Sequence, residues 1–397
     1  MNRSFILTTT VCLLRVCPLF SQEILVFYHI PKCGGTTAAS VVGQHFDVAE
    51  TYHQKRIQPQ KSVLEYHSSR GPHLLELDCI DLEKVKYIHG HQAFSDKTNL
   101  PEAKNFTILR DPIERVFSSY RYTNQHRKME FFEFYRERSN LQVLRFSTLS
   151  KEDPGISLKE HLESAKHTLS KKFFFVGIAE EMESSLKVLY RLMNWEPITL
   201  IPKFNITAKS NSHDPELYSF VFKEEWADRE LYEFAKALFT KYLEKTQALT
   251  VTPKTTDPVD TIRFSVDHPL DGEGWGYREM DLGTNTALRQ SYTQDAFIRF
   301  PLLKRDYVLK FKASFPSREA AKHFQLLVNG NKINCKHSSK GNWRKFKAKI
   351  PEKYIKEGKT VITFHTSDLY IPSEHQNVSD HRKLGIGISK IFIKPFP

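Results

Sequence analysis

Residues 29–37 form the segment His29-Ile30-Pro31-Lys32-Cys33-Gly34-Gly35-Thr36-Thr37. The apolar, β-prone residues 24–28 before this segment predict a buried strand. Residues 36–42, which begin at its last two residues, predict a helix. A strand, a glycine-bearing loop and a helix together present free backbone N–H groups to an anion. Gly34 and Gly35 allow the backbone to approach a ligand closely, and Lys32 adds a mobile cation. The segment predicts an anion site, but an ordinary strand-to-helix turn also fits these residues.

The composition is that of a folded protein with a basic surface. The chain has 397 residues, 40% hydrophobic and 26% charged, with a formal net charge of +12. This length allows about two or three domains. The positive charge favours an anionic ligand: a nucleotide, an acidic polysaccharide, an acidic lipid surface or a nucleic acid. The lysines and arginines form no block like a nucleic-acid-binding arm, so we expect no nucleic-acid partner.

The cysteines are few and irregularly spaced. There are five of them: Cys12, Cys17, Cys33, Cys79 and Cys335. An odd number without metal-type spacing argues against a disulfide scaffold and against a zinc site. We therefore expect reduced thiols and no bound metal.

Residues 5–20 are mostly apolar and follow Arg3, as in a signal peptide. However, Arg15 interrupts this run, no small-x-small cleavage site follows it, and it is too short and polar for a transmembrane span. A poor signal, a non-signal segment and a mis-assigned start codon all stay open. Membrane association and oligomeric state are undecided, and we favour a cytoplasmic location over a membrane-anchored or secreted one.

Two further predicted strands end in polar residues. Residues 84–88 lead into His89-Gly90-His91, and residues 105–109 lead into Arg110-Asp111-Pro112. Ligands bind at the carboxyl ends of strands in open α/β sheets. The two histidines could be a base, metal ligands or structural hydrogen-bonding groups. Arg110 could grip a phosphate or lie on the surface beside an ordinary helix N-cap.

The remaining chain divides into two parts. Strands and helices alternate up to residue 245, with helices over 125–172, 182–193 and 225–245 and a strand at 173–177, which predicts an α/β fold with a largely parallel sheet. From residue 262, short alternating runs and the hairpin signal Asn329-Gly330 predict an all-β, jelly-roll-like sandwich. We expect a poorly defined segment 1–22, an α/β domain 23–250, a linker 251–260 and an accessory domain 261–397.

Five motifs occur in order in the first part: His29 to Thr37, Tyr87 to His91, Ile108 to Arg115 with Ser118, Phe175-Val176-Gly177 with Glu180-Glu181, and Leu231 to Ala235. Through them, residues 24–245 resemble the membrane-associated carbohydrate sulfotransferases and their bacterial relatives, and above all the heparan sulfate 2-O-sulfotransferase branch. The resemblance implies a P-loop-like sulfotransferase domain. It also implies metal-free transfer of a sulfuryl group from 3′-phosphoadenosine 5′-phosphosulfate to a hydroxyl of a carbohydrate acceptor, which may be a small molecule or a polymer.

The resemblance also assigns residues to roles. The 5′-phosphosulfate would be held by residues 32–37, which are Lys32, Cys33, Gly34, Gly35, Thr36 and Thr37. Arg110 and Ser118 would hold the 3′-phosphate, and the polar loop around Lys209 would close over the nucleotide. His91 is our choice for the general base, with His89 as an alternative base or its partner, because histidine is well suited to take a proton near neutral pH. Lys32 would stabilise charge in the transition state.

The second part weakly resembles a β-sandwich module of bacterial glycan-modifying enzymes, through Gly274-Trp275, Val328-Asn329-Gly330 and residues 380–386. Glycan contact and a purely structural or oligomerising role both remain open. We expect Trp275, Tyr277 and Trp343 to pack in the core or at its rim rather than stack on sugars.

Two other functions compete with the sulfotransferase. A nucleotide-dependent kinase is disfavoured because Lys32 precedes the glycines, whereas the kinase-type phosphate loop has the order G-x-x-x-x-G-K-[ST]. A non-catalytic glycan-binding protein with a vestigial nucleotide site is disfavoured by the presence of Lys32, Arg110 and His91.

Overall fold

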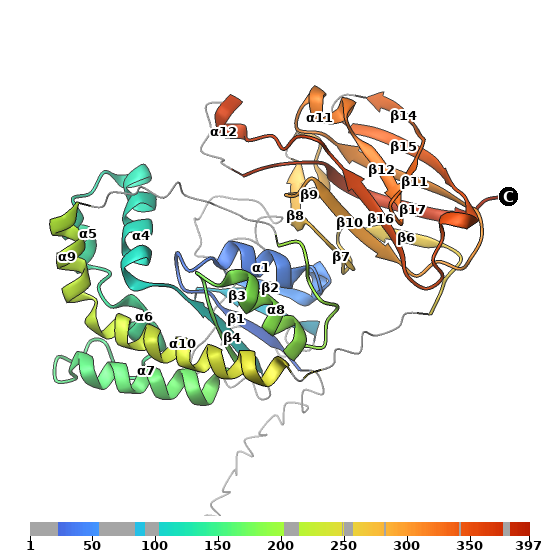
Figure 1. The fold of residues 1–397 in the computed structure, drawn as a ribbon. Helices are drawn as coiled ribbons and strands as arrows, with labels where there is room; N and C mark the ends of the chain where they lie inside the picture. Colours follow the sequence, from blue (N-terminus) through green and yellow to red (C-terminus); the bar gives the residue numbers. More distant parts are fainter. Residues whose placement is uncertain are drawn as a thin grey trace, which may run out of the picture.

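The computed structural model describes residues 23–54, 84–91, 103–201, 214–247, 249, 257–281, 283–340, 343–375 and 382–397. Two hydrophobic cores organise these residues, one in an α/β unit and one in a β-sandwich (Figure 1). Among the described helices, none is both long and apolar enough to cross a membrane. The apolar residues 5–20 lie outside the described part of the chain.

The first unit is a parallel sheet with helices around it. Its five strands have the order β2-β3-β1-β4-β5, and every neighbouring pair is parallel. The α/β prediction is thereby confirmed. The elements are β1 (Leu25–Tyr28), α1 (Gly35–Gly43), η1 (Val48–Glu50), β2 (Thr51–Gln54), β3 (Tyr87–Gly90), β4 (Lys104–Leu109), α4 (Pro112–Arg127), α5 (Phe131–Arg136), α6 (Leu141–Phe146), α7 (Leu158–Lys172), β5 (Phe175–Ile178), α8 (Met182–Leu192), α9 (Pro215–Glu224) and α10 (Trp226–Gln247).

The strands that carry the predicted site lie side by side. All four residues of β1 are buried, because helices pack on both faces of the sheet. In Figure 1, α1 lies on one side of the sheet, and α7 and α10 lie on the other. β3 and β4 flank β1, so the segments after these three strands meet at one edge of the sheet.

Several predicted boundaries were wrong. β3 ends at Gly90, so His89 lies within the strand. Phe173 caps the end of α7, and β5 begins only at Phe175. The region 125–172 is not one helical stretch, since residues 147–157 separate α6 from α7, whose start is fixed by a capping box between Ser157 and Glu160. β2 was not predicted, because residues 45–80 are polar; residues 55–83, 202–213 and 250–256 lie outside the described residues.

The second unit confirms the predicted sandwich of antiparallel sheets. One sheet has the order β13-β12-β16-β10-β7, and the other has the order β14-β15-β11-β17-β9-β8 with β6 paired to β17. The elements are β6 (Ile262–Ser265), β7 (Gly272–Glu273), β8 (Trp275–Asp281), β9 (Thr286–Ser291), β10 (Asp295–Phe300), β11 (Tyr307–Ser314), α11 (Arg318–Lys322), β12 (Gln325–Val328), β13 (Asn331–Ile333), β14 (Cys335–Lys340), β15 (Trp343–Ile350), η3 (Glu352–Tyr354), β16 (Thr360–His365), α12 (Pro372–His375) and β17 (Gly387–Pro395).

The aromatic residues considered as sugar platforms pack inside the sandwich unit. Trp275 is fully buried, and its Nε1 donates to the carbonyl of Phe297 at 3.0 Å. Trp343 is 6% exposed and donates to Asp281 Oδ2 at 2.8 Å, beneath the turn between β8 and β9. The side chain of Tyr277 lies outside the described part. The hairpin prediction at Asn329-Gly330 is confirmed, with φ values of 46° and 81° between β12 and β13.

The two units contact each other beside α1. Glu273 on β7 accepts hydrogen bonds from the backbone N–H groups of Thr199 and Leu200 at 2.7 and 2.6 Å. Just after α1, the carbonyl of Gln44 accepts from Leu270 N at 2.8 Å, and Val48 N donates to the carbonyl of Asp267 at 3.0 Å. The sandwich is therefore bonded to the segment that follows α1.

Candidate active site

The loop between β1 and α1 has the backbone shape of an anion site. Lys32 and Gly34 have left-handed φ values of 68° and 74°, and the N–H of Cys33 donates to the carbonyl of Ile30 at 3.2 Å. α1 begins at Gly35, and Gly34 at its N-cap makes no side-chain capping bond. The first N–H groups of a helix have no acceptor within the helix. The start of α1 is thus suited to an anionic oxygen.

Gly35 is required by a neighbouring ring. A Cβ atom at this position would lie 1.8 Å from Cδ2 and Nε2 of His29, so the imidazole packs directly on the loop backbone. At Gly34, a Cβ atom would lie 2.4 Å from Cε of Met182. The two glycines therefore serve close packing as well as the left-handed turn.

Three cations gather at this loop. Burial lowers the pKa of the Lys32 ammonium, and the positive charges of Arg110 and Arg121 lower it further. Lys32 Nζ lies 4.3 Å from the ring centroid of Tyr122, and Arg110 Nη1 donates to the carbonyl of Lys32 at 3.0 Å. Arg121 Nε is buried, and no acceptor within the described residues bonds to it. Arg110 also lies 3.7 Å from both Glu114 and Glu180, so the cations outnumber the acids at the loop by three to two, and this suits a negatively charged ligand.

The sequence analysis did not identify Arg121. It lies three residues after Ser118 on α4, and this i, i+3 spacing on a helix could have pointed to it. Ser118 is 4% exposed and lies one turn before Tyr122, whose ring contacts Lys32. The structure therefore brings this face of α4 to the loop.

Gln142 connects the two predicted phosphate-binding segments. Its Nε2 donates to the carbonyl of Arg110 at 2.9 Å, and its Oε1 accepts from Arg110 N at 3.1 Å. Its Oε1 also lies 3.6 Å from the Cys33 thiol, which donates to it. Cys33 is 1% exposed, and burial raises the pKa of its thiol to about 12. The Cys33 side chain thus faces the core, which differs from the expectation that it contacts the donor.

A buried charge network supports this arrangement. Arg115 on α4 lies 3.3 Å from Glu225 and 3.7 Å from Asp228, and all three side chains are fully buried. Asp228 accepts from the backbone N–H of Gln142 at 3.0 Å. The network joins α4, α6 and α10. It fixes the position of α4, which carries Ser118, and of Gln142, which bonds Arg110. Its role is structural.

The histidines meet at the end of β1. His91 Nδ1 lies 2.7 Å from the carbonyl oxygen of His29, and their ring centroids are 4.5 Å apart. A carbonyl only accepts, so Nδ1 carries the proton, and in the neutral ring Nε2 keeps its lone pair. Loss of contact with water lowers the pKa of His91. The hydrogen bond to His29 opposes this shift, and the positive charge of Arg145 adds to it. His91 is therefore held in the form that can accept a proton.

His89 and His29 have different surroundings. The His89 ring stacks on Tyr87 at a centroid distance of 5.1 Å, and His89 lies opposite Phe27 in the sheet register. His29, which the sequence analysis left without a role, lies between the loop and His91. It could have been found as the residue where β1 ends and the glycine loop begins.

Arg145 lies beside His91, and Lys151 lies near Arg145. Arg145 Nη1 donates to the carbonyl of His91 at 3.4 Å. The pKa of Lys151 is lowered, first by burial and then by the nearby charge of Arg145. This side of the site is also electropositive. No group of three or more His, Cys, Asp or Glu residues in the described part of the chain is arranged to hold a metal ion.

The chain is similar in part to several known proteins. A stretch of 130 residues is 29% identical to heparan sulfate 2-O-sulfotransferase 1 from Xenopus laevis, and it covers 27% of this chain and 36% of that protein. A solved sulfotransferase from Alicyclobacillus acidocaldarius is 14% identical over 57% of this chain and 99% of its own, with a TM-score of 0.33. A CBM35 from Paenibacillus barcinonensis is 12% identical over 34% of this chain and 99% of its own, with a TM-score of 0.22.

The family model describes most of the α/β unit. Residues 20–240 match the model of the Sulfotransferase family, and this range contains the loop, His89 and His91, and the whole of α4. With more than half of its length matched, the chain belongs to the Sulfotransferase family.

Proposed function

We propose that the protein transfers the sulfuryl group of 3′-phosphoadenosine 5′-phosphosulfate to a hydroxyl group of a carbohydrate. The family implies the donor, and the site residues fit its charges. The observation that carries the proposal is the position of His91 against the carbonyl of His29, at the edge of a loop where Lys32, Arg110 and Arg121 gather. A base and a polyanion site are thereby adjacent.

The donor would be held by two sets of groups. Lys32, the backbone N–H groups of Gly34, Gly35 and Thr36, and the hydroxyl of Thr37 would bind the 5′-phosphosulfate, since the N–H of Thr37 donates to the carbonyl of Gly34 at 3.1 Å. Arg110, Ser118 and Arg121 would bind the 3′-phosphate; the buried, unpartnered Nε of Arg121 supports adding it to the predicted pair. Cys33 would act by positioning, through its bond to Gln142.

Each residue of the site has a simple chemical task. The donor supplies an activated sulfuryl group when it is bound. His91 Nε2 would accept the proton of the acceptor hydroxyl, because Nδ1 is committed to the His29 carbonyl. Lys32 would stabilise the negative charge that develops on the transferred and leaving oxygens. His89 would act as a partner of His91, and metal-free transfer remains a prediction.

Two features favour a carbohydrate acceptor. The relative from Xenopus laevis is named for action on heparan sulfate. Arg145 beside His91, with Lys151 near Arg145, would also suit an acceptor with carboxylate or sulfate groups. We further propose that catalysis resides in residues 23–250, with a linker at 251–260 and an accessory domain at 261–397.

The test is transfer of labelled sulfate to a panel of glycans, with mass spectrometry to locate the added group. We expect transfer by the native chain, a rate about 10²–10³-fold lower for Lys32→Ala and a similarly severe loss for His91→Ala. Lys187→Ala on α8, an exposed lysine that pairs with Glu183, is the matched control and should keep full activity. Donor binding without transfer to any glycan would instead favour a non-catalytic glycan-binding protein.

A further inference from the structure

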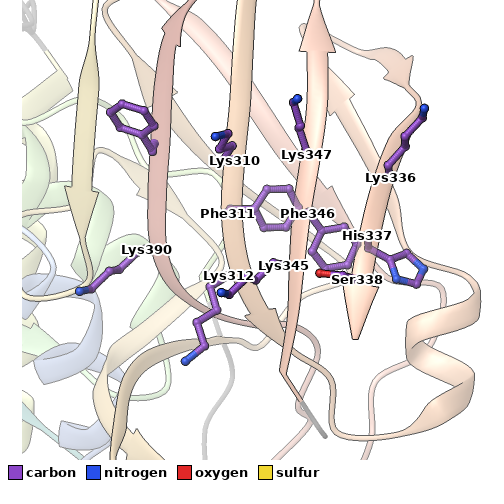
Figure 2. Close-up of a pocket in the computed structure, with 11 residues that line it drawn as sticks. Lys310, Phe311, Lys312, Lys336, His337, Ser338, Lys345, Phe346, Lys347 and Lys390 are labelled. Carbon is purple, nitrogen blue, oxygen red and sulfur yellow. The ribbon is translucent and has the colours of Figure 1, made fainter. Parts of the chain in front are cut away.

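One outer face of the sandwich carries a cluster of lysines. We call it the lysine face: Lys310 and Lys312 on β11, Lys345 and Lys347 on β15, Lys336 on β14 and Lys390 on β17. They line an open depression with a volume of about 540 Å³ (Figure 2). All are exposed except Lys312, which is half-buried.

The strand register brings these like charges together. Lys347 is directly opposite Lys310 on one side and Lys336 on the other. Lys312 is directly opposite both Lys345 and Lys390. Like charges that face each other across strands destabilise a sheet. The face therefore carries a repulsion that a bound anion would relieve.

The lysine face lacks the carboxylates that neutralise other lysines of this chain. On the same strand β15, Lys349 pairs with Asp306 at 2.8 Å. Among the described residues, no carboxylate pairs with any of the six lysines; Lys312 donates to the hydroxyl of Thr286 at 3.3 Å, and its Nζ lies 4.4 Å from the ring centroid of Trp343. Neighbouring strands are about 4.8 Å apart, so four adjacent strands spread these cations over roughly 14 Å. This spacing suits an extended ligand with repeated charges.

We propose that the lysine face binds an anionic polysaccharide, a chain with carboxylate or sulfate groups. This site is separate from the proposed active site and goes beyond it. The face offers lysines, which act as hydrated point charges, and none of the residues that line the depression is an arginine. Phe311 and Phe346 in the same lining are 4% exposed and pack in the core.

This composition distinguishes between the possible polyanions. A single-stranded nucleic acid is usually held by exposed aromatic rings on which bases stack, and base readout uses Arg, Asn and Gln. A membrane surface would call for exposed apolar side chains beside the cations. Two further rings line the depression: Phe392 is half-buried, and the exposed imidazole of His337 packs against Phe346 at a centroid distance of 5.4 Å. The choice of a polysaccharide among polyanions also rests on the proposed carbohydrate function.

The test compares binding of three probes to the full chain by calorimetry at several salt concentrations. The probes are a heparin oligosaccharide, a DNA duplex of equal charge and vesicles that contain phosphatidylserine. We expect the heparin oligosaccharide to bind most tightly. Lys310→Glu with Lys347→Glu should weaken its binding at least tenfold and flatten the salt dependence, since fewer counter-ions are released.

The matched control reverses the same charge elsewhere on the sandwich. Lys332 on β13 and Lys353 on η3 are exposed and lie outside the depression, so Lys332→Glu with Lys353→Glu should bind like the native chain. The variant Lys310→Gln with Lys347→Gln removes the two positive charges without adding acids, and it should also bind the heparin oligosaccharide more weakly than the native chain. Equal affinity of the lysine-face and control variants, or tighter binding of the DNA duplex or the vesicles, would overturn the proposal. The assay needs no sulfate donor, so failure of sulfuryl transfer alone would leave this binding result unaffected.

Discussion

The Nδ1 atom of His91 lies 2.7 Å from the carbonyl oxygen of His29, whose own ring packs against the backbone at Gly35. The proposed base is thus attached to the loop that would hold the donor. A shift of the loop would move the base with it, which keeps both in one geometry for in-line transfer.

The pH dependence of activity should reflect the state of His91. Crowding lowers its pKa from the usual 6.5, so the neutral, proton-accepting form persists to lower pH than for a free histidine. We expect kcat/KM to be flat near neutral pH and to fall on the acid side below pH 6.5. A pH–rate profile tests this. An acid limb centred above neutrality would contradict the assignment, and His91→Gln should remove the limb together with most of the activity.

Lys32→Ala should reduce transfer about 10²–10³-fold, as does loss of other groups that stabilise transition-state charge. The thermal stability of this variant should not fall, because burial and two arginines already disfavour the charged ammonium in the folded protein. Rates and melting temperatures of Lys32→Ala and of the control Lys187→Ala give the two readouts. Normal turnover by Lys32→Ala would remove the lysine from the mechanism.

Gly35→Ala should inactivate the enzyme and destabilise it by about 1–3 kcal/mol, because the new methyl group would collide with the His29 ring. Gly43→Ala is a control in the same helix. There the nearest atom to the added Cβ is Tyr87 Cε1 at 3.6 Å, an ordinary contact, so stability should rise by about 0.4–1 kcal/mol. Urea denaturation of both variants measures this difference, and equal effects would show that His29 does not constrain the loop.

Arg110→Ala and Arg121→Ala should each weaken binding of adenosine 3′,5′-bisphosphate by about 10–100-fold, as expected for one hydrogen bond to a charged group. Binding of adenosine 5′-monophosphate, which lacks the 3′-phosphate, should change far less. Calorimetry with both nucleotides separates the two effects. An equal loss for both ligands would mean that these arginines do not hold the 3′-phosphate.

Lys347→Glu should stabilise the protein, by about 0.2–1 kcal/mol, because it places a carboxylate opposite both Lys310 and Lys336. Urea denaturation of the single variant measures the gain, and Lys332→Glu serves as the reference. A loss of stability would show that cross-strand repulsion on the lysine face is negligible.

Sequence patterns predicted the elements whose burial is uniform or regularly alternating. β1 and β4 are apolar runs, and Asn329-Gly330 encodes its hairpin locally. β15 is an exception: its burial alternates regularly, but the sequence analysis did not single it out, because lysine is depleted in strands. β15 carries two residues of the lysine face, and these lysines have a low intrinsic preference for strands.

The candidate site was predictable where a motif lies on one segment. The loop and the strand-end residues His91 and Arg110 were named from the sequence. Arg121, His29 and Gln142 were not, because their places depend on how α4, β1 and α6 pack together. The inward direction of Cys33 likewise follows from tertiary packing, which no local pattern records.

The sandwich is held in one position on the α/β unit by hydrogen bonds. Glu273 bonds to Thr199 and Leu200, and the backbone groups of Gln44 and Val48 make further bonds. A polysaccharide held on the lysine face would then present its sugars to His91 at a constant distance along the chain. The fixed contact between the two units would set the distance between the two sites, and sulfate groups would appear at a preferred interval from the bound end of a polymer. Glu273→Ala would weaken this contact but keep the bonds of Gln44 and Val48, so it should leave transfer to a short acceptor unchanged and broaden the interval on a long one.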